Sequence, residues 1–286
     1  MSVAVSVPVN AGAQDLIYKV AGERGIALTF LPPLITRYEK APVYFLISGG
    51  GWYMENRESM LNLFPLTVKQ LRERGFAVVS VDYRVTEMGP YVTVEEEISD
   101  VMDAARYLAR YADVLKIDPQ HIVVSGHSAG GHLTLMMAWA PHDLFRRDSV
   151  LTEDFTVVGC VPLSPAVAFH GEVTAEPLIN LDVSHIYAGH VYDDAVAHRC
   201  SPYDYITAES VPTLLVHGSH DDLLSPENAR LAYAKGKRLG ADFDLLMPQN
   251  GGHCYECKVE GTTTFPGVDS IQRFVTAWVL KLLEEK

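Results

Sequence analysis

The chain has 286 residues, of which 48% are hydrophobic and 21% are charged, and its formal net charge is −13. This composition is typical of a globular protein with a substantial core, and the acidity argues against a nucleic-acid partner or an anionic membrane surface. No apolar run approaches the roughly 18 residues of a membrane span, and residues 1–14 lack the basic start of a secretory signal. We therefore expect a cytoplasmic protein.

Strand and helix patterns alternate along most of the chain. Residues 14–31 predict an antiparallel pair of strands at one sheet edge. Short apolar runs predict buried strands at 43–47, 76–81, 122–125, 156–163, 211–216 and 243–247. Apolar residues at helical spacing predict helices at 61–74, 93–115, 129–139, 226–239 and 268–283. This alternation predicts a single α/β domain over residues 1–286, with a mostly parallel sheet of about eight strands flanked by helices.

Two of the predicted helices carry a clear apolar stripe. The helix at 93–115 begins with a capping box formed by Thr93 and Glu96. The last helix repeats the stripe with Ile271, Phe274 and other apolar residues at helical spacing. We assign both stripes to the core rather than to a cofactor or partner surface.

The motif Gly126-His127-Ser128-Ala129-Gly130 lies directly between a predicted strand and a predicted helix. A G-x-S-x-G at such a turn is the setting of a nucleophile elbow, which holds a serine in a strained conformation. Side chains at 126 and 130 would collide with neighbouring elements, and the helix N-terminus favours an oxyanion beside Ser128. The alternative is a Gly/Ser turn that merely links strand and helix.

A serine nucleophile needs a base, and the base needs an orienting acid. In folds with such an elbow the chain order is Ser, then Asp or Glu, then His. Asp221 lies in an H-G-x-x-D loop after the strand at 211–216, with Asp222 as a less favoured neighbour. His253 ends a Gly-Gly-His loop after the strand at 243–247, and of the eleven histidines it has the place that a base requires.

Four other histidines near these loops are assigned lesser roles. His127 flanks the nucleophile, where it can line the substrate pocket but cannot easily act as the base. His132, one turn into a buried helix, is interpreted as a hydrogen-bonded structural residue. His217 and His220 lie on the loop of Asp221, too close in sequence to face that carboxylate usefully.

Four features resemble the α/β-hydrolase superfamily, in particular its small carboxylesterases of the hormone-sensitive-lipase and feruloyl- or acetylxylan-esterase-like type. They are Ser48-Gly49-Gly50-Gly51-Trp52, the elbow, the H-G-x-x-D loop and the G-G-H, spread over almost the whole chain. The resemblance implies an α/β-hydrolase fold with Ser128, His253 and Asp221 as a catalytic triad and with no cofactor.

The glycine run after the strand at 43–47 supplies the second half of the implied mechanism. Glycine lets the backbone approach a ligand without a Cβ in the way. By resemblance, the amides of Gly50 and Gly51, joined by that of Ala129, are the donors of an oxyanion hole. Relatives commonly have a histidine where this chain has Ser48, but donors that belong to the backbone tolerate that change.

The stretch 166–208 breaks the alternation of strands and helices. Connections of this length usually have a function or short helices of their own, and in the resembled fold they form a small cap. We therefore expect a cap-like insertion that shapes the substrate pocket. Its His and Tyr residues, each interpreted individually as a surface or packing residue, include His170, His185, Tyr187, His190 and Tyr192.

The sequence Cys254-Tyr255-Glu256-Cys257 directly follows His253. A single C-x-x-C without a second closely spaced Cys/His pair is a weak zinc signal. We expect no metal site, and a disulfide is not expected in a cytoplasmic protein.

Three classes of function remain open. The leading one is hydrolysis of a short-chain or aromatic carboxylic ester through an acyl-enzyme. The second is amide or arylformamide hydrolysis, because residues 126–132 also resemble kynurenine-formamidase-like members. The third is a non-catalytic ligand-binding module. A small-molecule ester is the expected ligand, with Trp52, Tyr53 and His127 as expected contacts, and a homodimer is left open.

Overall fold

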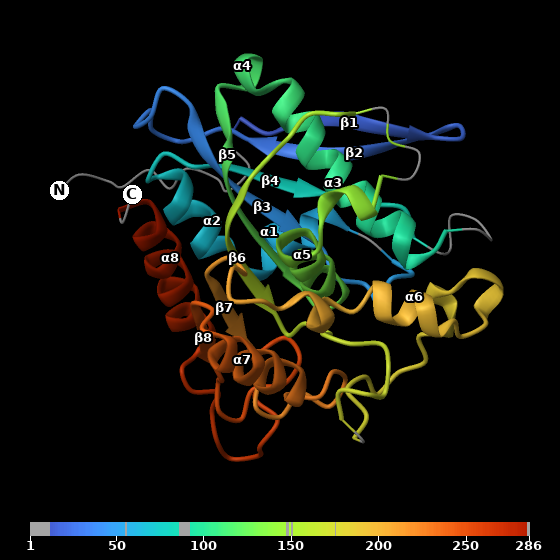
Figure 1. Ribbon diagram of the computed structural model, residues 1–286. Helices are drawn as coiled ribbons and strands as arrows, with labels where there is room; N and C mark the ends of the chain where they lie inside the picture. Colours follow the sequence, from blue (N-terminus) through green and yellow to red (C-terminus); the bar gives the residue numbers. More distant parts are fainter. Residues whose placement is uncertain are drawn as a thin grey trace.

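The computed structural model describes residues 12–54, 56–85, 92–146, 149, 151–174 and 176–284. The prediction that residues 1–14 lack a secretory signal falls mostly on residues 1–11, which lie outside the described residues. The strands within it form one sheet in the order β1-β2-β4-β3-β5-β6-β7-β8 (Figure 1). Their bounds are β1 Gln14–Ala21, β2 Arg24–Leu31, β3 Ala41–Ile47, β4 Ala77–Val81, β5 Ile117–His127, β6 Val157–Leu163, β7 Thr213–Val216 and β8 Phe243–Leu246.

The sheet is antiparallel at one edge and parallel elsewhere. β1 pairs with β2, and β2 with β4, in antiparallel register, whereas the ladders from β4 through β3, β5, β6 and β7 to β8 are parallel. The predicted α/β fold, with a mostly parallel sheet of eight strands and an antiparallel edge pair, is confirmed for the described residues.

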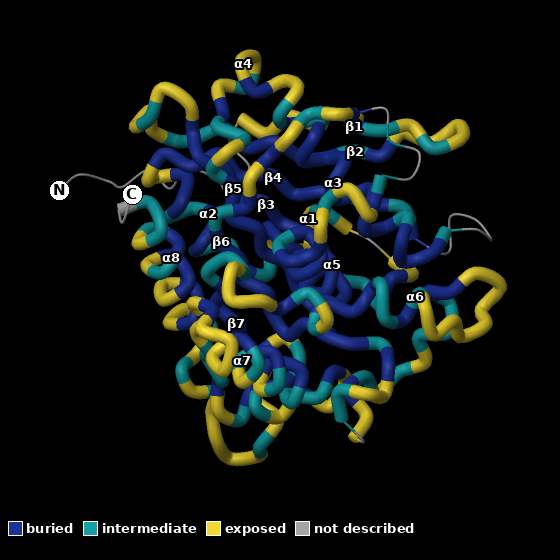
Figure 2. The backbone as a smooth tube through the Cα atoms, viewed as in Figure 1, coloured by how far each residue is buried: buried dark blue, intermediate teal, exposed yellow. Residues whose placement is uncertain are grey.

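Helices cover both faces of the sheet. The helices of the described residues, including α6 in the insertion, are α1 Arg57–Leu63, α2 Pro65–Arg72, α3 Val94–Arg110, α4 Ala112–Leu115, α5 Ala129–Trp139, α6 Asp194–Arg199, α7 Glu227–Leu239 and α8 Val268–Glu284. Along β3, Val43 and Phe45 face the core beneath α3, α5 and α7, whereas Tyr44 faces the core beneath α1, α2 and α8 (Figure 1). The central strands and α5 are the most deeply buried elements (Figure 2).

The parallel ladder brings four loops to one edge of the sheet, because parallel strands all end there. The glycine run follows β3, and the motif around Ser128 follows the adjacent strand β5. The loop of Asp221 follows β7, and the loop of His253 follows the neighbouring strand β8. Residues far apart in the sequence therefore meet above the carboxyl ends of four strands.

Two predicted helices are each divided in the structure. The helix expected at 61–74 is two helices, α1 and α2, because Pro65 starts α2 and disfavours helical geometry at Phe64 (φ −125°, ψ 53°). The helix expected at 93–115 is interrupted at Tyr111 between α3 and α4. Its predicted capping box is present, since the Glu96 carboxylate accepts from the Thr93 backbone N–H at 2.9 Å.

The stripe predicted on the last helix is only partly core. Ile271, Val275 and Val279 of α8 are buried, but Phe274 is 47% exposed, because this helix lies at the outside of the fold. Among the described residues, no helix combines the length and apolar character that a membrane crossing requires.

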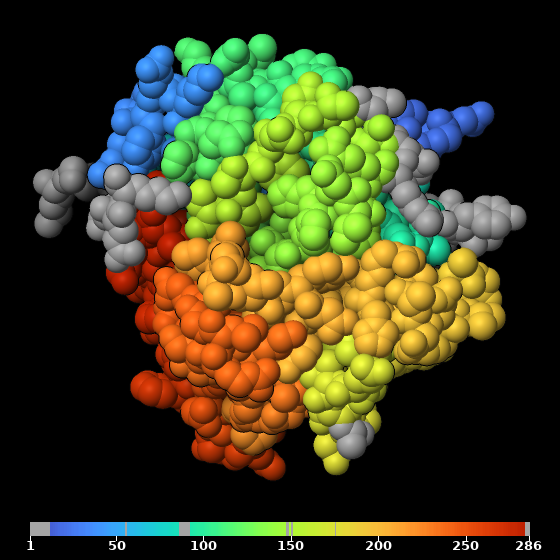
Figure 3. Space-filling model, in the orientation of Figure 1, coloured from blue at the N-terminus to red at the C-terminus, as the bar shows by residue number. Residues whose placement is uncertain are grey.

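The insertion at 166–208 contains short helical segments. They are η3 Ser184–Ile186, η4 Ala188–His190, α6 and η5 Pro202–Tyr205. On the face drawn in Figure 3, the yellow-to-gold insertion lies beside the orange segment that follows it in the chain. The short helices expected within the insertion are therefore present.

Candidate active site

Ser128 stands at the turn between β5 and α5, with left-handed backbone geometry (φ 60°, ψ −122°). Its own N–H donates to the carbonyl of Leu163 in β6 at 2.9 Å, which fixes the turn on the sheet. A Cβ on Gly126 would lie 2.4 Å from the carbonyl oxygen of Gly130. A Cβ on Gly130 would lie 2.2 Å from that of Ile47. The collisions expected at both glycines are confirmed.

Gly130→Ala should lower the free energy of unfolding by about 3 kcal/mol, because the clash is with backbone of the central strand β3, which cannot move aside. The shift in the urea midpoint measures this loss. Gly171→Ala is the matched control, since a Cβ there would meet nothing within 4 Å. Equal midpoints for the two variants would contradict the tight packing of the elbow.

Asp221 and His253 are joined across the ends of β7 and β8. The Nδ1 of His253 lies 2.7 Å from Oδ2 of Asp221, whose side chain is fully buried. The Oδ1 of the same carboxylate accepts the backbone N–H groups of Leu223 and Leu224, each at 3.0 Å. Nε2 of His253 is buried and has no hydrogen-bond partner among the described residues. Asp221 thus orients the imidazole through Nδ1, and Nε2 is available to accept a proton.

His217 also contacts Asp221, so the expectation that it lies too close in sequence to do so is wrong. Its Nε2 is 3.1 Å from Asp221 Oδ2 and 3.0 Å from the carbonyl oxygen of Leu224. The chain turns tightly here, with the Asp221 N–H donating to the Gly218 carbonyl, and this turn brings the Asp221 carboxylate to the His217 ring nitrogen. Because both neighbours of Nε2 are acceptors, Nε2 carries the proton.

The charge of Asp221 is held by these donors. Burial by itself raises the pKa of the carboxyl, but hydrogen bonds from His217 and His253 outweigh burial and hold the pKa of Asp221 well below its usual range. The carboxylate therefore stays ionised while it orients His253.

His217→Ala should lower kcat about tenfold, because a buried charged acceptor loses one donor and holds His253 less firmly. His217→Gln should recover most of kcat, since its amide N–H reaches the same acceptor. Steady-state kinetics with KM and kcat separated checks this, and a purely structural role for His217 predicts no recovery. Wild-type kcat in the alanine variant would contradict the positioning role.

The main-chain carbonyl of His253 is anchored by two side chains. His127 Nε2 lies 2.9 Å from this oxygen, and the Ser164 hydroxyl donates to it at 3.0 Å. Burial and the neighbouring His253 lower the pKa of His127 to about 4, so its ring is neutral at neutral pH. His127 therefore holds the loop of His253, a role that the sequence did not indicate.

The glycine run forms a tight turn beside the elbow. Gly50 has φ 148°, and its carbonyl accepts the N–H of Met54 at 3.0 Å. A Cβ on Gly50 would lie 2.0 Å from the Met54 carbonyl oxygen, so only glycine fits. The hydroxyl oxygen of Ser48 accepts the N–H of Asn56 at 3.3 Å, so Ser48 supports the loop.

Two imidazoles secure the residues that follow Gly50. Trp52 is buried, and its Nε1–H donates to Nδ1 of His132 at 3.2 Å. The other nitrogen of His132 lies 2.8 Å from the Cys200 carbonyl, which confirms the structural role expected for His132. His185, from the insertion, lies with Nε2 2.7 Å from the Gly51 carbonyl. The insertion thus contacts the glycine turn directly.

A cavity of about 450 Å³ opens above these groups. Seven of the nine residues predicted for the site line it: Gly50, Gly51, Trp52, Tyr53, His127, Ser128 and His253. Asp221 and Ala129 are buried and are not among the lining residues. Apolar lining residues that the sequence did not indicate are Met54, Met60, Leu63, Leu181, Leu223 and Leu224.

The rival candidates lie elsewhere. Asp222 pairs with Lys258 at 3.2 Å on the surface, and Nδ1 of His220 contacts the Ser219 hydroxyl. The four cysteines, all in the described part of the chain, are thiols. Cys254 lines the cavity, with its sulfur 3.9 Å from His127 Nε2.

The sheet topology and the strand-to-helix turn at Ser128 define an α/β-hydrolase fold. The chain belongs to the BD-FAE family, whose family model matches residues 30–235. It is similar to the probable carboxylic ester hydrolase LipM of Mycobacterium tuberculosis, with 30% identity over 237 residues that cover 74% of this chain and 52% of LipM. Esterase LipC of that organism is 25% identical over 240 residues, covering 82% and 58%. The chain spans about half the length of these curated relatives.

Solved structures of esterase 2 from Thermogutta terrifontis share the fold. The form phosphonylated by sarin matches with a TM-score of 0.76 at 23% identity, covering 96% of this chain and 94% of that chain. The butyrate-bound form gives 0.74 at 24% identity, with 96% and 92% coverage. The form phosphorylated by paraoxon gives 0.71 at 22% identity, with 94% and 92% coverage.

Proposed function

We propose that this protein is a carboxylic ester hydrolase in which Ser128 is the nucleophile, His253 the general base and Asp221 the orienting acid. The observation that carries the proposal is the position of His253. Its Nδ1 is 2.7 Å from the ionised Asp221, its buried Nε2 has no partner among the described residues, and His253 lines the same cavity as Ser128. An imidazole oriented at one nitrogen and available at the other is what a serine nucleophile requires.

The proposed reaction proceeds in two halves. Ser128 Oγ attacks the ester carbonyl carbon while its proton passes to His253 Nε2, and the carbonyl electron pair moves to oxygen. The amides of Gly50, Gly51 and Ala129 stabilise that oxyanion. Its collapse expels the alcohol, which takes the proton from Nε2, and leaves an acyl-enzyme. Water then attacks the acyl carbon with His253 again as base, and this releases the acid and restores Ser128.

The substrate class follows from the size and lining of the cavity. A volume of about 450 Å³ lies in the lower part of the usual range for small-molecule sites, and its walls include Met60, Leu63 and Leu181. Structures of the Thermogutta esterase contain propionate and butyrate. We assign short-chain acyl esters to this chain.

The insertion at 166–208 is proposed to act as a cap within a single domain of residues 1–286. Of its residues, Leu181 lines the cavity, and His185 supports the glycine turn through Gly51. The other residues singled out from the sequence, such as Tyr187 and Tyr192, are not among the lining residues. The insertion therefore contributes Leu181 to the wall of the pocket and His185 to the support of the glycine turn.

A chain-length series of p-nitrophenyl esters, with N-formylkynurenine in parallel, tests the proposal. We expect the highest kcat/KM for acetate to butyrate and a steep fall for longer chains, because the cavity is small. Faster turnover of the formamide than of every ester would make the protein an arylformamidase. No turnover of either class, with a Ser128→Ala variant equally inactive, would favour a ligand-binding module and contradict the proposal.

A further inference from the structure

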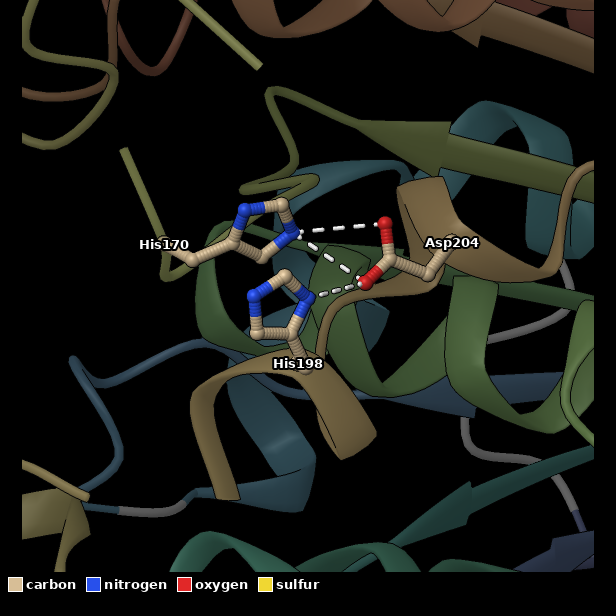
Figure 4. Close-up of side chains that lie close together, drawn as sticks. All are labelled: His170, His198 and Asp204. Atoms are coloured by element: carbon tan, nitrogen blue, oxygen red, sulfur yellow. Dashed lines mark hydrogen bonds and ion pairs between the residues drawn. The ribbon is translucent and has the colours of Figure 1, made fainter. Parts of the chain in front are cut away.

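We propose that His170, His198 and Asp204, in the insertion, form a binding site for a divalent transition-metal ion, with Zn²⁺ as the favoured ion. The Nε2 of His170 and the Nδ1 of His198 both point at the carboxylate of Asp204 (Figure 4). None of the three residues lines the cavity of Ser128. This inference departs from the sequence, which predicted no metal and interpreted His170 as a surface or packing residue.

The distances fit the coordination shell of zinc. His198 Nδ1 is 2.9 Å from Asp204 Oδ2, and His170 Nε2 is 3.2 Å from the same oxygen. One ligand atom from each residue lies within 4.8 Å of the others. In a tetrahedral site with Zn–N distances of about 2.05 Å, ligand atoms are about 3.3 Å apart. The separations of the two histidine nitrogens from Asp204 Oδ2 are therefore close to those of a zinc site.

One movement is required before the ion is bound. The two imidazole rings are stacked, with centroids 3.8 Å apart and planes inclined by 18°. In this arrangement the lone pairs of the two ligand nitrogens are nearly parallel and do not point at a common position. The rings must tilt for both nitrogens to converge on one ion. The His170 side chain is 4% exposed and held, whereas that of His198 is 33% exposed on α6 and is the ring that can tilt.

The backbone around the three ligands is already ordered. Ser201 Oγ donates to the Ala197 carbonyl and accepts the N–H of Phe169, which ties the segment of His170 to α6. Asp193 caps α6 through the N–H of Val196. The ligands therefore come from three segments that hydrogen bonds hold together, and little ordering entropy opposes binding.

The surroundings of the second ring nitrogens also suit a metal site. Nε2 of His198 faces the carboxylate of Glu172 at 3.9 Å, the carboxylate–histidine pairing that commonly supports metal-bound imidazoles. Nδ1 of His170 is buried without a partner among the described residues. His170 borders a cavity of about 270 Å³, which can supply a water to that nitrogen.

The donor set selects the ion. Two imidazoles and one carboxylate suit Zn²⁺, with water at the remaining position, whereas Mg²⁺ and Ca²⁺ favour oxygen ligands alone. The ion would fasten the loop after β6 to α6 and η5. We therefore assign it a role in holding the insertion in place, and the site is independent of the proposed ester chemistry.

Zinc binding to the full-length protein after chelator treatment tests the proposal. Equilibrium dialysis with metal analysis should give about one Zn²⁺ per chain, and the melting temperature should rise with Zn²⁺ concentration. Asp204→Asn and His198→Gln should each lose both effects. His121→Gln is the matched control, because His121 forms a two-residue pair with Asp118 at 2.7 Å and should leave zinc binding unchanged.

Co²⁺ as a spectroscopic probe of the unmutated protein locates the ion even if a variant fails to fold. We expect d–d absorption of a four-coordinate ion without sulfur-to-metal charge transfer. A sulfur band would place the ion at Cys254 or Cys257 and overturn the proposal. Binding below about 0.1 equivalent, or equal binding by Asp204→Asn, would also overturn it and make the three residues an ion-pair network alone.

Discussion

Ser128→Ala should lower kcat/KM for p-nitrophenyl acetate by about 10⁴-fold or more, because no other nucleophile then stands at the elbow. Residual turnover above the spontaneous rate is expected from the proposed oxyanion donors, the amides of Gly50, Gly51 and Ala129. The melting temperature should stay close to that of the wild type, since the change removes one hydroxyl.

Ser270→Ala is the control for the loss of a serine. Ser270 is exposed in the first turn of α8, and its substitution should leave kcat/KM unchanged. Stopped assays at equal protein concentration, determined by absorbance, measure both variants. More than a tenth of wild-type activity in Ser128→Ala would mean that the hydrolysis depends on another residue.

His253→Gln should lose activity to a similar extent, because the amide can still donate to Asp221 but cannot take a proton from Ser128. Triad members act as a unit, so the double variant with Ser128→Ala should lose little more than either change alone. Folding is checked by circular dichroism.

His220→Gln is the matched histidine control. His220 is exposed on the loop of Asp221 and contacts the Ser219 hydroxyl, so kcat/KM should be unchanged. Activity retained in His253→Gln would show that the base was wrongly assigned. His127, whose ring centroid lies 4.7 Å from that of His253, would then be the next residue to test.

The strands and the positions of the site loops could be predicted because their signals are local. Apolar runs mark β3 to β8, and topology then decides where the following loops meet. The elbow was predictable for the same reason, since a G-x-S-x-G needs only a strand before it and a helix after it. Glycine at 126 and 130 is required by contacts that the structure confirms.

The division of the helix predicted at 61–74 could have been predicted from Pro65, but the regular apolar spacing on both sides of this proline suggested one helix. Pro65 is compatible with the first turn of a helix but not with an interior position, and it ends α1 before α2 begins. The apolar positions on both sides still pack on the same face of the sheet, which is why the periodicity reads as one helix.

The support of the site could not be predicted, because it depends on turns and long-range contacts. His217 reaches Asp221 only because the chain reverses at Gly218, and His127 holds the loop of His253 from 126 positions away. The approach of His170, His198 and Asp204 likewise depends on how the insertion folds. These contacts cannot be inferred from the spacing of residues in a single sequence.

Labelling with paraoxon tests the role of Ser128 most directly. Attack of Ser128 Oγ on phosphorus would release p-nitrophenolate and leave a diethylphosphoryl group on the serine, as the Thermogutta esterase is phosphorylated by paraoxon. Peptide mass spectrometry should find one label per chain, on the peptide of Ser128, in step with loss of esterase activity. Labelling should be absent in Ser128→Ala and strongly slowed in His253→Gln. A label on another residue, or full esterase activity after prolonged exposure, would contradict Ser128 as the nucleophile.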